Sequence, residues 1–228
     1  MLSLLLASAF FLLIHFVVSG TRLRDALVAR VGAVPYRGAF SLASLVGILW
    51  MSDAYSHAPT IELWGTLLRL RPVVFVLVFV AVLFVVIGLA SPSPTSVGME
   101  AKLAHGADTV RGITRITRHP FLWGVALWAL MHLLANGDLA SLILFGSLLL
   151  LALAGTAVID AKRRRRYGEQ WQAFAGSTSN IPFAAIAAGR NRLGPALREI
   201  GIVRAVIAIG VYVLIFALHG RVIGAPLT

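Results

Sequence analysis

Six long uncharged runs dominate this sequence and decide what it can fold into. Each run is mostly apolar and holds no Asp, Glu, Lys or Arg: residues 1–21, 38–52, 73–90, 120–137, 139–159 and 205–220. A helix that crosses a bilayer needs roughly 20 predominantly apolar residues, so each run is a candidate membrane span. The runs do not alternate between apolar and polar residues as barrel strands do. The sequence therefore predicts an all-α, polytopic bundle of about six transmembrane helices, with residues 1–228 forming a single domain.

The positive charges are distributed unevenly between the predicted loops. The net charge is +11, which in a soluble protein would indicate nucleic-acid binding. In a membrane protein, Lys and Arg instead mark the cytoplasmic loops. With the N-terminus outside, all but three of the 20 Lys and Arg residues lie inside, the exceptions being Arg69, Arg71 and Arg221. The pattern predicts that both termini are outside, that the inner face contacts anionic membrane lipids, and that nucleic acid is not a partner.

The first run resembles a signal peptide, because Ala7-Ser8-Ala9 has the small residues of a cleavage site. No Lys or Arg precedes this tripeptide, and the apolar run continues beyond it to Val18. We therefore expect a retained helix rather than a cleaved signal.

The segment from Asp160 to Arg198 is too polar to span a membrane. It opens with a basic run, and Trp171 and Phe174 follow at a spacing that places them on one helical face. Basic and aromatic residues in this arrangement are typical of a helix that lies in the membrane interface. We expect such a helix between the fifth and sixth spans, either as an anchor or as a lid or floor to an embedded site.

Four histidines lie in or beside the predicted spans: His15, His119, His132 and His219. Ionisable groups in membrane helices are costly and point to function, although a single histidine can simply form an interhelical hydrogen bond. Imidazole is also the commonest metal ligand and holds iron in haem proteins. The residues alone leave both interpretations open.

Aromatic residues precede two of these histidines by one helical turn. Phe11 lies four residues before His15, and Trp128 lies four residues before His132, so each pair shares a helix face. An aromatic wall beside an imidazole suits a flat macrocycle, but ordinary helix packing produces the same pattern. Because the chain has no cysteine, thiolate chemistry and cysteine metal ligands are excluded.

Three motifs give the chain a resemblance to the NnrU family of membrane proteins over nearly its whole length. They are HFVVSGTRLR at 15–24, ITRHPFLWGVALWALMHLLANGD at 116–138, and IDAKRRRRYGEQWQAFAGSTSNIPFAAIAAGR at 159–190. The resemblance implies a protein of the bacterial inner membrane. It also implies an association with nitric oxide and nitrite respiration, and so a possible respiratory complex as partner.

Plant carotene isomerases that contain haem b look like relatives within this family. Carried onto this sequence, the resemblance implies haem b held by His15 and His132. Phe11 and Trp128, one turn before these histidines, are then candidate porphyrin contacts. The implied activity is redox-dependent cis-trans isomerisation of a lipid-soluble polyene. Where the plant enzymes have a cysteine near the second histidine, this chain has Ala129, so a thiolate-based ligand exchange does not transfer.

A more distant resemblance links the chain to isoprenylcysteine and phospholipid methyltransferases of membranes. Its residues are Arg118 and His119 before the fourth run, and Asp160 and Trp171 after the fifth. The resemblance implies an alternative site on the cytoplasmic side that binds S-adenosylmethionine. A non-enzymatic role in assembling or regulating a respiratory complex is the third interpretation, and sequence alone does not decide among the three.

Overall fold

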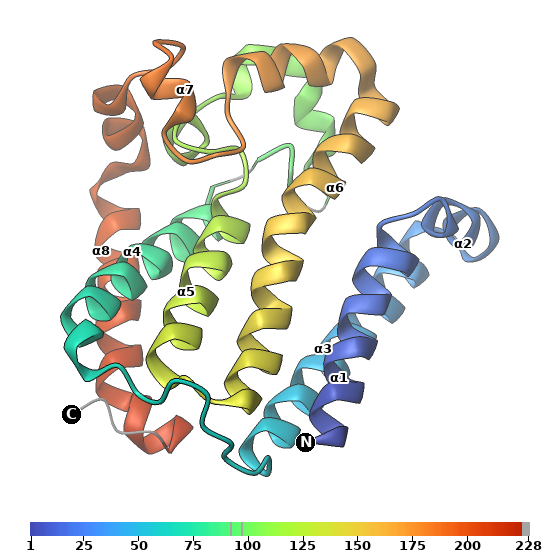
Figure 1. The fold of residues 1–228 in the computed structure, drawn as a ribbon. Coiled ribbons are helices and arrows are strands. Elements are labelled where there is room, and N and C mark those ends of the chain that lie inside the picture. The colour runs from blue at the N-terminus through green and yellow to red at the C-terminus, as the bar shows by residue number, and fades with distance from the viewer. Residues whose placement is uncertain (92, 97, 225–228) are drawn as a thin grey trace. The chain divides into compact units, whose positions relative to one another are not determined.

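The computed structural model describes residues 1–91, 93–96 and 98–224, and within these residues the chain is almost entirely helical. The described residues form no strand beyond an isolated bridge between Glu62 and Asp138. Five of their helices are long and apolar enough to cross a membrane. They are α1 (Leu2–Leu13) with its π-helical continuation η1 (Ile14–Ser19), α3 (Ala33–Ser56), α4 (Arg71–Leu89), α6 (Leu139–Ser177) and α8 (Leu193–Ile223) (Figure 1). The chain is therefore an all-α, multi-pass membrane protein, as the sequence predicts.

The fourth apolar run forms a shorter helix, α5 (Pro120–Asn136), with 17 residues. At 1.5 Å per residue it is about 25 Å long, close to the thickness of a hydrocarbon core. It begins at Pro120, whose fixed φ suits the first helical turn. Gly137, at φ +68°, makes the tight turn to α6, and Asp138 caps α6 by accepting the Ser141 N–H at 2.9 Å.

The loops contain short helices. They are α2 (Leu23–Val31), η2 (Leu68–Leu70), η3 (Glu100–Thr109), η4 (Gly112–Arg115) and α7 (Ala184–Ala187). Of these, η3 and η4 lie in the polar segment between α4 and α5. Helix α4 ends at Leu89, one residue before the end of its apolar run.

The predicted helix after the fifth span is present, and its position in the membrane interface stays a prediction. The fifth span continues past Ile159, and a kink at Gly168, where φ is +46°, separates it from a second helical segment that ends at Ser177. Trp171 and Phe174 follow the kink and are 1% and 0% exposed, packed with Leu103 and Val110. These two aromatic residues therefore belong to a protein core and do not face lipid, because η3 covers them.

The chain divides into two compact units, and the prediction of a single domain stays a prediction. Unit 1 comprises residues 1–74 and 129–158, and unit 2 comprises residues 75–128 and 159–228. Within unit 1, α1 and α3 lie side by side (Figure 1). Gly47 allows this approach, since a Cβ there would lie 2.9 Å from the ring of Phe11.

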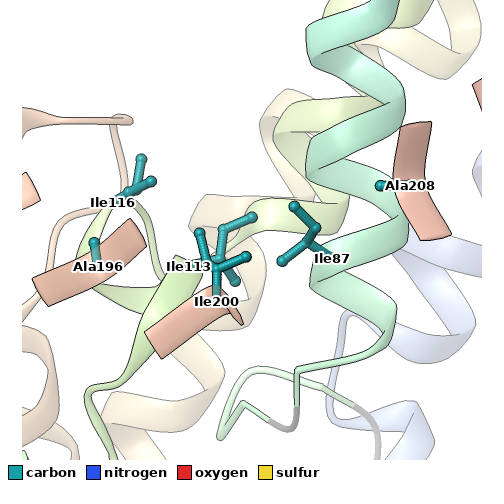
Figure 2. Packing of buried hydrophobic residues seen from close by; sticks show 6 residues of the cluster. All are labelled: Ile87, Ile113, Ile116, Ala196, Ile200 and Ala208. Atoms are coloured by element: carbon teal, nitrogen blue, oxygen red, sulfur yellow. The ribbon is translucent and has the colours of Figure 1, made fainter. Parts of the chain in front are cut away.

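The core of unit 2 joins its loops to its long helices. Isoleucine and alanine side chains from α4, the segment around η4 and α8 pack together in Figure 2: Ile87, Ile113, Ile116, Ala196, Ile200 and Ala208. Burial of these side chains fixes the backbone that leads into α5. This apolar cluster therefore helps to position the polar residues at the start of α5.

Candidate functional site

His15 lies in η1, where the α-helix widens to a π-helix. Such segments are rare and occur often at functional sites. The Nδ1 atom of His15 lies 2.7 Å from the carbonyl oxygen of Phe11. Because a carbonyl only accepts, Nδ1 carries the proton, and Nε2 keeps its lone pair. This arrangement is the one that metal-ligating histidines commonly use to fix their tautomer.

Aromatic rings surround the His15 imidazole. The ring centroid of Phe11 is 4.4 Å away, and that of Phe40, from α3, is 5.1 Å away. The imidazole itself is half-buried. The sequence predicts the Phe11 contact from helix spacing, but Phe40 comes from a different helix and has no local signal.

His132 lies near the end of α5 in unit 1, the same unit as His15. Its ring centroid is 5.0 Å from that of Phe145 on α6. Trp128, the other predicted porphyrin contact, lies one turn earlier, in the part of α5 that belongs to unit 2. Within the described residues there is no group of three or more potential metal ligands among His, Asp and Glu. A haem with two axial histidines does not require such a group, so ligation by His15 and His132 stays a prediction.

The residues of the predicted alternative site come together in unit 2. His119 Nε2 lies 2.6 Å from Asp160 Oδ1. Arg118 Nε donates to both oxygens of Asp160, at 3.1 and 3.0 Å, and its Nη2 also donates to Oδ2. The Arg118 guanidinium lies over the Trp171 ring, 5.7 Å from its centroid. We name Arg118, His119, Asp160 and Trp171 the polar cluster.

Burial lowers the pKa of His119, which is 3% exposed. Its hydrogen bond to Asp160 acts in the opposite direction, but the positive charges of Arg118 and Arg163 oppose protonation. Arg118 already compensates the carboxylate, so His119 is neutral near pH 7 and donates its Nε2–H to Asp160. The polar cluster therefore contains one ion pair and one neutral donor.

The charged and polar side chains of the polar cluster form their hydrogen bonds with one another. Both oxygens of Asp160 are occupied, and Asp160 is 8% exposed. A buried carboxylate with these partners ties the start of α5 to α6. The hydrogen bonds of Asp160 suit a structural role better than a role as a general acid or base.

A loop after α6 contributes residues that the sequence analysis misses. Thr117 Oγ1 donates to the Asn180 carbonyl at 2.5 Å, and Trp123 Nε1 donates to the Asn180 side chain at 3.2 Å. The Arg118 backbone N–H donates to the Ser179 carbonyl at 2.9 Å. The small polar run at residues 177–180 marks this loop in the sequence, but nothing there identifies the partners.

Comparison with known proteins places these features in a family. The sequence model described as NnrU protein matches residues 3–227. Two curated relatives are chloroplastic 15-cis-zeta-carotene isomerases, 39% identical over 82 residues in Zea mays and 40% identical over 82 residues in Arabidopsis thaliana. The match covers 36% of this chain and 22% of each relative, so the chain spans about a fifth of their length. No solved structure matches.

Proposed function

Since the chain belongs to the NnrU protein family, we propose that it is a cis-trans isomerase of a carotenoid-like polyene dissolved in the membrane. The observation that carries this proposal is the similarity to two 15-cis-zeta-carotene isomerases. The long apolar helices support it, because a lipid-soluble substrate reaches such a protein from the bilayer. An association with nitric oxide or nitrite respiration has no support beyond the family name and stays a prediction.

We propose haem b as the cofactor, with His15 and His132 as its axial ligands. The geometry of His15 fits this role, since its Nδ1–H is held by the Phe11 carbonyl and Nε2 is the nitrogen left to bind iron. A bound haem supplies reversible one-electron chemistry to a conjugated substrate. The chain's own residues orient the ligand and exclude water: Phe11 and Phe40 flank His15, and Phe145 packs on His132.

An absorption spectrum tests the cofactor separately from the activity. Protein purified after expression with ample haem should show a Soret band, and His15→Ala or His132→Ala should abolish it. His57→Ala is the matched control, because the His57 side chain is 77% exposed at the end of α3, and it should leave the band unchanged. A colourless wild-type protein would contradict the haem proposal.

Turnover tests the activity itself. Membranes that contain the wild-type chain should convert 15-cis-zeta-carotene to an isomer that chromatography separates, and membranes that contain His15→Ala should not. Haem binding without conversion of this or any other cis-polyene would retain the cofactor and reject the isomerase.

The assembled polar cluster favours a second candidate, an S-adenosylmethionine-dependent membrane methyltransferase. Arg118, His119 and Asp160 meet in unit 2, as the distant resemblance to methyltransferases implies. Calorimetry should then detect binding of S-adenosylmethionine that Arg118→Gln weakens. We rank this candidate second, because the three side chains already satisfy one another. The role as partner of a respiratory complex stays a prediction, tested by co-purification with a nitric oxide reductase.

A further inference from the structure

A cavity of about 550 Å³ opens in unit 2, away from the residues discussed so far. Its lining residues are mostly polar and come from the turn after α4, from η3 and the start of η4 with Arg111 between them, and from α8. The charged residues among its lining are Lys102, Asp108, Arg111, Glu199 and Arg204. Neither the haem proposal nor the polar cluster uses any of them.

The cavity has an excess of positive charge. The negative charge of Glu199 is compensated by Arg115, which donates to the carboxylate through Nε and Nη2, both at 2.8 Å. The Gly112 N–H also donates to this carboxylate, at 2.6 Å. Lys102 and Arg111 have no ion-pair partner within the part of the chain that the structure describes. Three cations in the lining thus face one uncompensated carboxylate, that of Asp108.

Arg204 is held in a defined position at the cavity. Its guanidinium donates to the carbonyl oxygens of Glu199 and Ile200, at 3.4 and 3.1 Å. These carbonyls precede the kink of α8 at Gly201, where φ is +76°. The kink exposes them, and Arg204 binds them in place of the helix's own donors.

The cavity lies where apolar helices meet polar segments. Ser91, in its lining, comes two residues after the end of α4, and Arg204 stands at the start of the uncharged run 205–220. Where apolar helices give way to polar segments, the phosphates of a surrounding bilayer are the expected neighbours. Basic pockets between transmembrane helices at this boundary are suited to anionic head groups.

We propose that this cavity binds a phosphate group, supplied by the head group of an anionic phospholipid. Guanidinium and ammonium groups recognise phosphate oxygens through charge-assisted hydrogen bonds. A volume of about 550 Å³ accommodates a small head group. Free inorganic phosphate has the same chemistry, so the experiment distinguishes the two sources. The proposal is independent of the polyene and of haem.

The test measures lipid binding to the detergent-purified full chain by native mass spectrometry. The probe is a short-chain phosphatidylglycerol, and phosphatidylcholine of the same chain length is the neutral comparison. We expect phosphatidylglycerol to bind about tenfold more tightly, and we expect Lys102→Gln/Arg111→Gln to remove that preference. Arg164→Gln/Arg165→Gln is the matched control, since it removes the same charge from an exposed run outside the cavity. It should keep the preference.

The outcomes separate the proposal from general electrostatic attraction. Equal binding of the two lipids, or equal loss in both double variants, would overturn it. If millimolar inorganic phosphate displaces the lipid, the cavity recognises phosphate from either source, and if it does not, the lipid is the ligand. Asp108→Asn guards against misfolding of the double variant. It removes the opposing charge and should tighten phosphatidylglycerol binding about threefold, and unchanged binding would contradict the proposal.

Discussion

The two candidate sites differ in whether their side chains keep an atom that can bind a ligand. In unit 1, His15 makes one hydrogen bond to a backbone carbonyl and lies between two phenylalanine rings. In unit 2, the carboxylate of Asp160 is bound by both Arg118 and His119. The first arrangement keeps a nitrogen lone pair for a ligand, whereas in the second the side chains bind one another. The three charged or polar side chains Arg118, His119 and Asp160 are therefore weaker evidence for catalysis here than one oriented imidazole.

The comparison also concerns stability. An interaction that is complete in the folded chain stabilises it, and removing one partner leaves a buried charge unpaired. A group that is kept open for a ligand contributes less to the fold. Substitutions in the polar cluster should therefore affect unfolding strongly, and substitutions at His15 should affect binding.

The largest expected effect is that of Asp160→Ala. It leaves the half-buried Arg118 and the buried His119 without their shared partner, and we expect a loss of about 3–5 kcal/mol in the free energy of unfolding. Thermal unfolding in detergent measures the loss. Asp53→Ala, which removes a carboxylate with a side chain that is 74% exposed, should change little. Similar melting temperatures for the two variants would mean that the polar cluster does not stabilise the fold.

The second effect is a dependence of stability on pH. Because burial lowers the pKa of His119, the folded chain keeps this imidazole neutral, whereas the unfolded chain takes up a proton below about pH 6.5. Stability is therefore present above pH 6.5 and is lost as the pH falls, by up to about 1.4 kcal/mol for each step of one in pH. Unfolding measured between pH 7.5 and 5.5 should show this slope, and His119→Gln should reduce it. An unchanged slope in the variant would assign it to other groups.

The third effect concerns unit 1. His15→Ala loses one neutral hydrogen bond and some ring packing, so we expect a cost of only about 1 kcal/mol in apoprotein stability. The same substitution should remove the haem absorbance completely. Unfolding of the apoprotein and the absorption spectrum together measure the contrast. A cost as large as that of Asp160→Ala would make His15 a structural residue and erase the difference between the sites.

The smallest effect is expected at the Arg115–Glu199 ion pair. The side chains are 26% and 32% exposed, so solvent screens the pair, although hydrogen bonding to Glu199 raises the pKa of Arg115. A double-mutant cycle with Arg115→Gln and Glu199→Gln should give a coupling of about 1 kcal/mol or less. A coupling near that of a buried pair would place this pair with the polar cluster.

The apolar runs predict the long helices well, because the preference of a segment for the membrane depends on its own amino-acid composition. The run at 38–52 lies within α3, and the run at 205–220 lies within α8. The end of α6 is missed because the polar residues after Ile159 favour helix as well, and Asp160 turns inward to meet Arg118. Hydropathy has no information about such a partner.

The sites are only partly predictable, for a related reason. Sequence spacing relates Phe11 to His15 within one helix, and family resemblance groups Arg118 with Asp160. Neither source of information reveals that Arg118 and Asp160 form an ion pair. Neither reveals that Asn180 accepts hydrogen bonds from Thr117 and Trp123, about 60 residues away. Contacts between distant segments depend on tertiary packing, which has no local signal.

The π-helical segment Ile14–Ser19 has a consequence for how this protein could change. A π-turn holds one residue more than an α-turn, so deletion of a single residue there would restore regular α-helix. The π-turn holds its extra residue locally, so such a deletion would leave the helix before it and the basic loop after it in their present relative orientation. One residue more or less in this segment would thus change the orientation of His15, which lies within it, and leave the flanking segments in place.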